Sequence, residues 1–490
     1  MISLRAKWGL SLILILLAGC SLQPTYERPD SAVAGEYPTG PAYQPASGST
    51  PPAVEIGWRD FLKDARLQRL VQLALENNRN LRLAALNIAQ FQAQYRITRS
   101  QLFPQVDAAA GSTAERVPSN LSPNRNITTH QYSVDLGASW TLDFFGRIRS
   151  LSDQALQQYL ATAQAGKATS ILLVSQVADQ YLTILAADEL LAVTKHTLET
   201  AQRSYELTLA QFEAGTTSEL FVQQARTVVE QANANYAAQL RARAQAENAL
   251  ALLVGAPLPA DLPPGAPFDS QALLADIPQG LPSELLTRRP DIMQAEANLR
   301  AAYANIGAAR AAFFPDISLT ATLGTASTQL SGLFGSGSLA WSFVPSITQP
   351  IFTGGRLTAN LDLAELQKDA SIAQYQLTIQ TAFREVADGL AARGTYDEQI
   401  ASLERYVVAA QRFLDLAEDR FRAGVDSYLN VLTAQTNLYT AQQLLVQTRL
   451  ARLTNLVDLY ESLGGGWIER SGDAPRPAED LSPKLPSERR

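Results

Sequence analysis

Hydrophobic and polar residues alternate along four stretches of the chain. In the clearest stretch, the apolar positions are Val134, Leu136, Ala138, Trp140 and Leu142, and small or polar residues separate them. Such alternation predicts a β-strand with one apolar and one polar face. The expected strands cover about 104–117, 130–143, 315–327 and 338–350. Their lengths suit tilted strands that cross a lipid bilayer, although a soluble sheet would show the same alternation.

Four strands are too few to close a membrane barrel, because the smallest such barrels have about eight strands. An open sheet edge in lipid would leave backbone hydrogen-bonding groups without partners. We therefore expect several copies of the chain to close one barrel. Dimers and trimers both give an even number of strands, and the pattern alone does not choose between them.

Two long segments without proline predict unusually long helices. Proline is absent from 148–256 and from 351–474. The expected long helices cover 148–213 and 356–422, and the expected return helices cover 219–253 and 428–463. At 1.5 Å per residue, each long helix would extend roughly 95 Å.

Each long helix is followed by a glycine and then a serine, which predicts the tip of a helical hairpin. The glycine would end one helix and the serine would cap the next. The expected tips, at 213–218 and 422–427, contain Gly215, Thr216, Thr217 and Ser218 in the first hairpin and Gly424, Val425, Asp426 and Ser427 in the second. Apolar or small residues at near 3.5-residue spacing in the last helix predict a coiled-coil seam. The members of that seam are Leu429, Leu432, Thr436 and Tyr439, followed by Val446, Leu450, Leu453, Val457 and Tyr460.

The chain repeats itself. Gly146-Arg147 recurs 209 residues later as Gly355-Arg356, and Ala201-Gln202-Arg203 recurs at the same offset as Ala410-Gln411-Arg412. Several matches in one order at one offset indicate an internal duplication. The expected halves are 61–255 and 282–465. An N-terminal wrapping segment (20–60), a linker (256–281) and a C-terminal tail (466–490) surround them.

The N-terminus has the features of a bacterial secretory signal. Arg5 and Lys7 precede a short apolar run, and small residues lead to Cys20. Cys20 is the only cysteine, and the residues before it resemble a lipobox, which predicts cleavage after residue 19 and attachment of acyl chains such as palmitate to Cys20. Loss of two positive charges with the signal would change the net charge from −7 to −9.

Composition gives no indication of catalysis or of nucleic-acid binding. The mature chain would be acidic, which disfavours a nucleic-acid partner. There are two histidines, His130 and His196, and neither has a second ligand at metal-binding spacing. No phosphate-binding glycine loop is recognisable. We therefore expect neither an enzyme nor a metal or cofactor site, apart from the lipid on Cys20.

Several motifs resemble one protein family. These are Asp143-Phe144-Phe145-Gly146-Arg147, Arg288-Arg289-Pro290-Asp291-Ile292, Phe314-Pro315 and Gly464-Gly465-Gly466-Trp467. Together with the duplication and the lipobox, they resemble the outer-membrane factors of tripartite drug efflux pumps, especially OprM-like (NodT-type) lipoproteins of the TolC superfamily.

The resemblance implies a membrane β-barrel joined to a long α-helical barrel. Three protomers with four strands each would form a 12-stranded barrel, a periplasmic coiled-coil tube and an equatorial domain. The implied location is the outer membrane, with extension into the periplasm. The implied partners are outer-membrane lipid, a periplasmic adaptor that contacts the hairpin tips, and an inner-membrane transporter of the resistance-nodulation-division class.

The resemblance also implies a gate at the periplasmic end, formed by inward side chains at the start of the last long helix. In this chain those positions are Leu429, Asn430, Thr433 and Thr436, with Phe421 across the hairpin. Leu429 would form an apolar ring, unless it belongs to the helix seam. Because Asn430 and Thr433 are neutral, we expect no strong cation-binding ring, although Asp426 offers a charge at the tip.

The implied function is passive conduction of antibiotics and other amphiphilic small molecules out of the cell. An outlet for a secreted polypeptide or for metal ions is the alternative, because it would use the same tube with another inner-membrane partner. A coiled-coil spacer without a pore is a third hypothesis, which the alternating strands disfavour.

Overall fold

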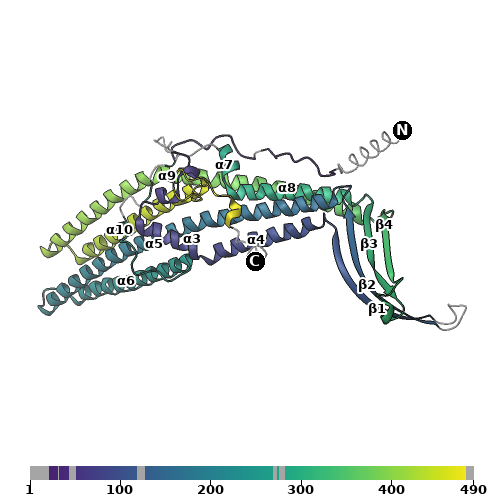
Figure 1. The fold of residues 1–490 in the computed structure, drawn as a ribbon. Coiled ribbons are helices and arrows are strands. Elements are labelled where there is room, and N and C mark those ends of the chain that lie inside the picture. The colour runs from purple at the N-terminus through teal and green to yellow at the C-terminus, as the bar shows by residue number, and fades with distance from the viewer. Residues whose placement is uncertain are drawn as a thin grey trace.

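The computed structural model describes residues 21–30, 32–43, 51–117, 127–268, 273–274, 277 and 282–481. These residues form an elongated protomer with a sheet at one end and two helical hairpins at the other (Figure 1). The expected signal segment 1–19, Cys20, residues 269–272, 275–276 and 278–281 of the expected linker and the last nine residues of the tail lie outside the described residues.

The sheet contains four antiparallel strands in the order β1-β2-β3-β4. They are β1 (Gln105–Val117), β2 (Ile127–Leu142), β3 (Asp316–Ser327) and β4 (Leu339–Thr348). All four strands occur where alternation predicted them. Strand β2 begins three residues before the expected start at 130, because residues 127–129 pair with residues 115–117 of β1.

Four long helices form the two hairpins. They are α5 (Arg147–Glu213) with α6 (Glu219–Val254), and α9 (Arg356–Arg422) with α10 (Tyr428–Ser462). Helix α5 contains the one described window that is apolar enough to cross a membrane by composition, but 61% of that window is buried inside the protomer. We therefore interpret α5 as a core helix.

Shorter elements connect the hairpins and the sheet. They are η1 (Ala53–Glu55), α2 (Trp58–Phe61), α3 (Ala65–Asn77), α4 (Arg79–Ser100), α7 (Pro282–Arg288), α8 (Pro290–Ala311), η2 (Leu330–Gly332) and η3 (Ala478–Leu481). Helix α4 leads into β1 and α8 leads into β3, so each half has the order helix, two strands, long helix, return helix. This order confirms the internal duplication.

The main hydrophobic core lies in the middle of the protomer, where α3, α5, α8, α9 and α10 meet. Phe61, Leu182, Ile292 and Tyr460 are almost completely buried there, and the ring of Phe61 stacks on that of Tyr460 at 4.0 Å. A second, smaller core fills the hairpin end and consists largely of alanines and leucines.

The expected seam of α10 is wrong in its first half. The buried residues there are Tyr428, Val431, Ala434, Gln435, Leu438 and Ala441, whereas Leu429 and Thr436 are exposed. The buried face is rotated because α10 packs against α5 as well as against α9. In the second half of α10, Val446, Leu453, Val457 and Tyr460 are buried as expected.

Candidate functional site

The sheet has one apolar and one polar face. Residues that lie opposite each other on neighbouring strands share a face, and Leu323 lies opposite both Leu136 and Trp341. These three side chains are exposed, Trp341 by 72%. The intervening residues are mostly polar, and the hydroxyls of Thr322 and Ser342 lie 2.7 Å apart. One face therefore suits lipid and the other suits water.

Both outer strands of the sheet have an open edge. Among the described residues, β1 pairs only with β2, and β4 pairs only with β3. A single protomer is thus a curved strip, not a closed barrel. Pairing of β1 with β4 of another copy would satisfy the open backbone groups, as a membrane barrel requires.

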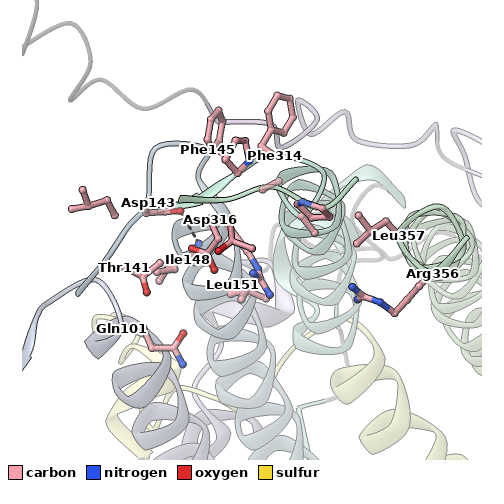
Figure 2. Close-up of a pocket in the computed structure, with 17 residues that line it drawn as sticks. Gln101, Thr141, Asp143, Phe145, Ile148, Leu151, Phe314, Asp316, Arg356 and Leu357 are labelled. Atoms are coloured by element: carbon pink, nitrogen blue, oxygen red, sulfur yellow. Dashed lines mark hydrogen bonds between the residues drawn. The ribbon is translucent and has the colours of Figure 1, made fainter. Parts of the chain in front are cut away.

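A cavity of about 540 Å³ lies where the strands meet the long helices, and residues of both halves line it (Figure 2). Asp143 accepts hydrogen bonds from the backbone N–H groups of Ile148 (3.0 Å) and Arg149 (2.8 Å), so it caps the start of α5. The rings of Phe145 and Phe314 stack at 4.8 Å. Asp316, from the polar face of the sheet, also lines the cavity, so this cavity opens on the water side.

An N-terminal strap, residues 21–30, lies along α8 and runs away from the sheet (Figure 1). Gln23 lies against Gly307, where an added Cβ would be 2.9 Å from the Gln23 Cα. The ring of Tyr26 packs edge-on against Tyr303 at 5.5 Å. The strap therefore runs antiparallel to α8, and its first residues lie nearest the strands.

A buried carboxylate, Glu296, holds the strap. It is 7% exposed and accepts hydrogen bonds from the Arg28 guanidinium at 2.9 Å, the Arg300 guanidinium at 2.9 Å and the Tyr26 hydroxyl at 3.0 Å. Burial by itself would raise the pKa of Glu296, but the bonds from Arg28, Tyr26 and Arg300 outweigh it and hold this pKa below 4.5. Burial and the neighbouring carboxylate raise the pKa of Tyr26 to about 12.

A glycine ends the long helix at each hairpin tip, as expected. Gly215 and Gly424 both have φ +72°, and the N–H of Thr216 donates to the carbonyl of Gln211, which closes a Schellman motif. The expected serine caps are correct in position but not in hydrogen bonding. Ser218 and Ser427 occupy the N-cap positions, but their side chains make no capping hydrogen bond. Both serines are exposed at the tip, where water can accept hydrogen bonds from the first N–H groups of the helix.

The charge expected from Asp426 is paired within its own tip. Its carboxylate accepts a hydrogen bond from the Arg420 guanidinium at 2.5 Å, and this bond lowers the pKa of Asp426. Val425, beside it, is 63% exposed. The tips thus offer backbone turns, hydroxyls and one apolar side chain to a partner.

Four of the five expected gate residues lie on one exposed face of α10. Leu429, Asn430, Thr433 and Thr436 are exposed, Leu429 by 56%. The hydroxyls of Thr433 and Thr436 donate to carbonyls one turn earlier. Phe421 is not on this face, because its half-buried ring packs against Tyr428 at 5.1 Å.

Two hydroxyl contacts between the hairpins were missed by sequence reasoning. The hydroxyls of Ser204 and Tyr428 lie 2.9 Å apart, and those of Thr194 and Tyr439 lie 3.1 Å apart. Both contacts join α5 to α10. These two tyrosines of α10 were the available signal, because a buried tyrosine hydroxyl usually finds a partner.

The family comparison matches both halves of the chain. The model of the family described as outer membrane efflux protein matches residues 70–256 and 281–465. The toluene efflux pump outer membrane protein TtgC of Pseudomonas putida is 49% identical over 482 residues, which cover 98% of this chain and 99% of that protein. The outer membrane protein OprJ of Pseudomonas aeruginosa is 45% identical, with 95% and 97% covered.

Solved structures share the fold. The open state of the MtrE outer membrane channel of Neisseria gonorrhoeae has a TM-score of 0.82 and 39% identity, and the match covers 93% of this chain and 100% of that one. The sheet and helical hairpins therefore correspond to the β-barrel and helical tube of such channels. The chain belongs to the outer membrane efflux protein family, as an outer-membrane channel protein that extends into the periplasm.

Proposed function

We propose that three copies of this chain form the outer-membrane channel of a tripartite efflux system. The channel conducts antibiotics, solvents and other amphiphilic small molecules out of the cell. The observation that carries this proposal is the four-stranded strip with one lipid-suited face, one polar face and two open edges. Relatives named as toluene and antibiotic efflux pump proteins support the class of cargo.

The channel itself is passive and catalyses no reaction. An inner-membrane transporter of the resistance-nodulation-division class supplies the energy, and a periplasmic adaptor joins it to the hairpin tips. The exposed Val425 and the tip hydroxyls support contact with such an adaptor. The exposed face of Leu429, Asn430, Thr433 and Thr436 faces the lumen and closes it, with Leu429 as the apolar ring.

A lipid on Cys20 anchors each protomer in the outer membrane. Cys20 itself lies outside the described residues, but the strap that follows it runs along α8 with its first residues nearest the strands. This direction brings the anchor toward the membrane end of the protomer. Replacement of Cys20 by Ala should abolish labelling by palmitate, and unchanged labelling would contradict the anchor.

The proposal is tested by accumulation of a fluorescent amphiphilic dye and of unrelated antibiotics in cells with and without the gene. We expect accumulation to rise without the gene and to return to normal with the intact gene. A truncated gene that ends at Pro290 is the control, because it lacks the second half of the sheet and should not restore efflux.

Unchanged accumulation in the deletion strain would contradict a role in drug efflux. Screening the same strain for a retained secreted polypeptide or for metal sensitivity would then test the alternative cargo. Either result would be compatible with the channel architecture. It would change only the proposed cargo and the proposed inner-membrane partner.

A further inference from the structure

The two halves of the protomer pair their strands in the same register. The sequence offset between the halves is 211 just before β1 and β3, at the Phe-Pro pairs, and 209 just after β2 and β4, at the Gly-Arg pairs. Asp107 of β1 lies opposite Gly137 of β2. Their counterparts at these offsets, Ser318 of β3 and Ser346 of β4, also lie opposite each other. The duplication therefore extends to the pairing of individual residues.

The two halves meet where β2 pairs with β3. This pairing places Ala138 opposite Ala321 and Leu142 opposite Ile317. The same offsets lead from β2 to β4 and from β3 back to β1, so the counterpart of this contact joins β4 to β1. These are the two outer strands of the sheet. Because four strands are too few to close on themselves, the counterpart can form only between two copies of the chain.

Transfer of the β2–β3 register to β4 and the β1 strand of a neighbouring copy places Ile347 opposite Ala110. It also brings Ile351, just past the end of β4, beside Val106. Both rows lie on the apolar face, which includes Trp341 in β4 and Val106 in β1. A shift by one residue would put apolar side chains opposite polar ones. Shifts by two residues would preserve the faces, so the duplication alone chooses among these registers.

The exposure of the outer strands agrees with this register. Ile351 is 90% exposed and Val106 is 67% exposed. Leu142 and Ile317, which occupy the counterpart positions within the protomer, are only partly exposed. In the transferred register, Ile351 and Val106 of the neighbouring copy would cover each other as Leu142 and Ile317 do.

We infer that β4 of one copy pairs with β1 of the next in the register that places Ile347 opposite Ala110. This seam continues the β2–β3 interface around the barrel, so contacts within a protomer and contacts between protomers alternate. The inference rests on the proposed assembly of three copies. It goes beyond that proposal by naming the residues that meet at each of the three junctions.

Disulfide formation between copies tests the register. The full-length protein with Ile347→Cys and Ala110→Cys is oxidised with copper phenanthroline in outer membranes. Directly opposite residues of antiparallel strands have Cα atoms about 4.5–5.5 Å apart, which lies within the range of about 4.4–6.8 Å that a disulfide spans. We expect covalent dimers and trimers on non-reducing gels, and their loss after reduction.

Two matched variants keep Ile347→Cys and move the second cysteine by two residues on the same face of β1, as Ala108→Cys or Ser112→Cys. In the inferred register these positions lie diagonally across the seam, about 7–8 Å from residue 347. We expect them to cross-link at least about threefold less than the Ala110→Cys pair. Ile347→Cys alone, which keeps Cys20, should form no covalent oligomer. If Ile347→Cys prevents assembly, Phe343→Cys with Ala114→Cys tests the same register.

Two results would overturn the inference. One is equal or stronger cross-linking by a shifted pair, and the other is no cross-linking by any pair in a protein that still forms a heat-resistant oligomer. If the unaltered protein formed no such oligomer, the proposed assembly itself would be contradicted. Failure of the register is therefore distinguishable from failure of the proposed function, which the accumulation assay measures separately.

Discussion

The sheet end and the hairpin end of the protomer are held by different kinds of contact. On the sheet side of the hairpins, Glu296 in the first half of α8 collects hydrogen bonds from three side chains, and Asp143, at the end of β2, caps α5. At the hairpin end, α10 meets α5 through two pairs of hydroxyls, and Gln435 between them has no partner. Charge-assisted bonds are roughly twice as strong as neutral ones. The difference indicates that the contact between α5 and α10 is held less firmly than the strap and the start of α5.

The largest effect should come from a charge on the apolar face of the sheet. Leu323→Arg places a guanidinium where lipid is expected and should destabilise the inserted barrel by about 2–4 kcal/mol. Thr320→Arg, on the polar face of the same strand, should be tolerated. Heat-resistance of the oligomer on gels and recovery in the outer-membrane fraction measure both variants.

If Leu323→Arg and Thr320→Arg reduced the heat-resistance and the recovery of the oligomer equally, the assignment of the two faces would be contradicted. If Thr320→Arg alone were harmful, the apolar face would instead line the interior. The sheet would then not be the element inserted in the membrane, and the sheet end could not be called the membrane end of the protomer.

The strands show what alternation can predict. Period-two patterning gave the four strands and their faces, because one buried or lipid-covered surface forces every second residue to be apolar. The same reasoning failed for the first half of α10. A seam of 3.5 spacing assumes one partner helix, whereas α10 has two, so Tyr428 and Val431 are buried in place of Leu429.

The contacts that distinguish the two ends could not be predicted from the sequence. Arg28 and Glu296 are 268 positions apart, and no local spacing links them. Gln435 belongs to a helix rich in glutamine, and only the packing of three helices shows that it is buried. The glycine stops at Gly215 and Gly424 were predictable, because they depend on neighbouring residues alone.

The second prediction concerns the strap. Glu296→Gln removes the charge that holds Arg28 and Arg300 and should destabilise the protein by about 1–3 kcal/mol. Hydrogen–deuterium exchange of residues 21–30 should become faster. Glu365→Gln is the control, since its contact with Arg310 spans 3.6 Å between half-exposed side chains and should be worth at most about 1 kcal/mol.

Acid should reproduce the effect of Glu296→Gln. The pKa of Glu296 lies below 4.5 in the folded protein, so its stabilising contribution is complete above that value and is lost as the pH falls through the lowered pKa. Exchange in the strap of the unaltered protein should therefore rise at acid pH. If exchange showed the same pH response in Glu296→Gln, another group would hold the strap.

The third prediction concerns Asp179, between the two ends. Burial, with Asp458 and Glu461 nearby, raises its pKa to about 8. The folded protein therefore keeps a proton that the unfolded chain releases above about 3.8, so stability falls as the pH rises from 4 to 8. Asp179→Asn should remove this decline and stabilise the protein by about 1–2 kcal/mol at pH 8. Melting temperatures from pH 5 to 8 measure it, with the exposed Asp388→Asn as control. A constant difference across this range would contradict the assignment.

The smallest effect on stability is expected for Leu429→Ala, which should instead change the conductance of the channel. Leu429 is 56% exposed, so Leu429→Ala should change the free energy of unfolding by at most about 0.5 kcal/mol. If three copies of Leu429 close the tube, the same substitution should raise the single-channel conductance, because a smaller apolar ring admits water. Val425→Ala, at an equally exposed tip position, should leave conductance unchanged. Unchanged conductance in Leu429→Ala would show that Leu429 does not close the tube. The closure would then lie elsewhere on the exposed face of α10.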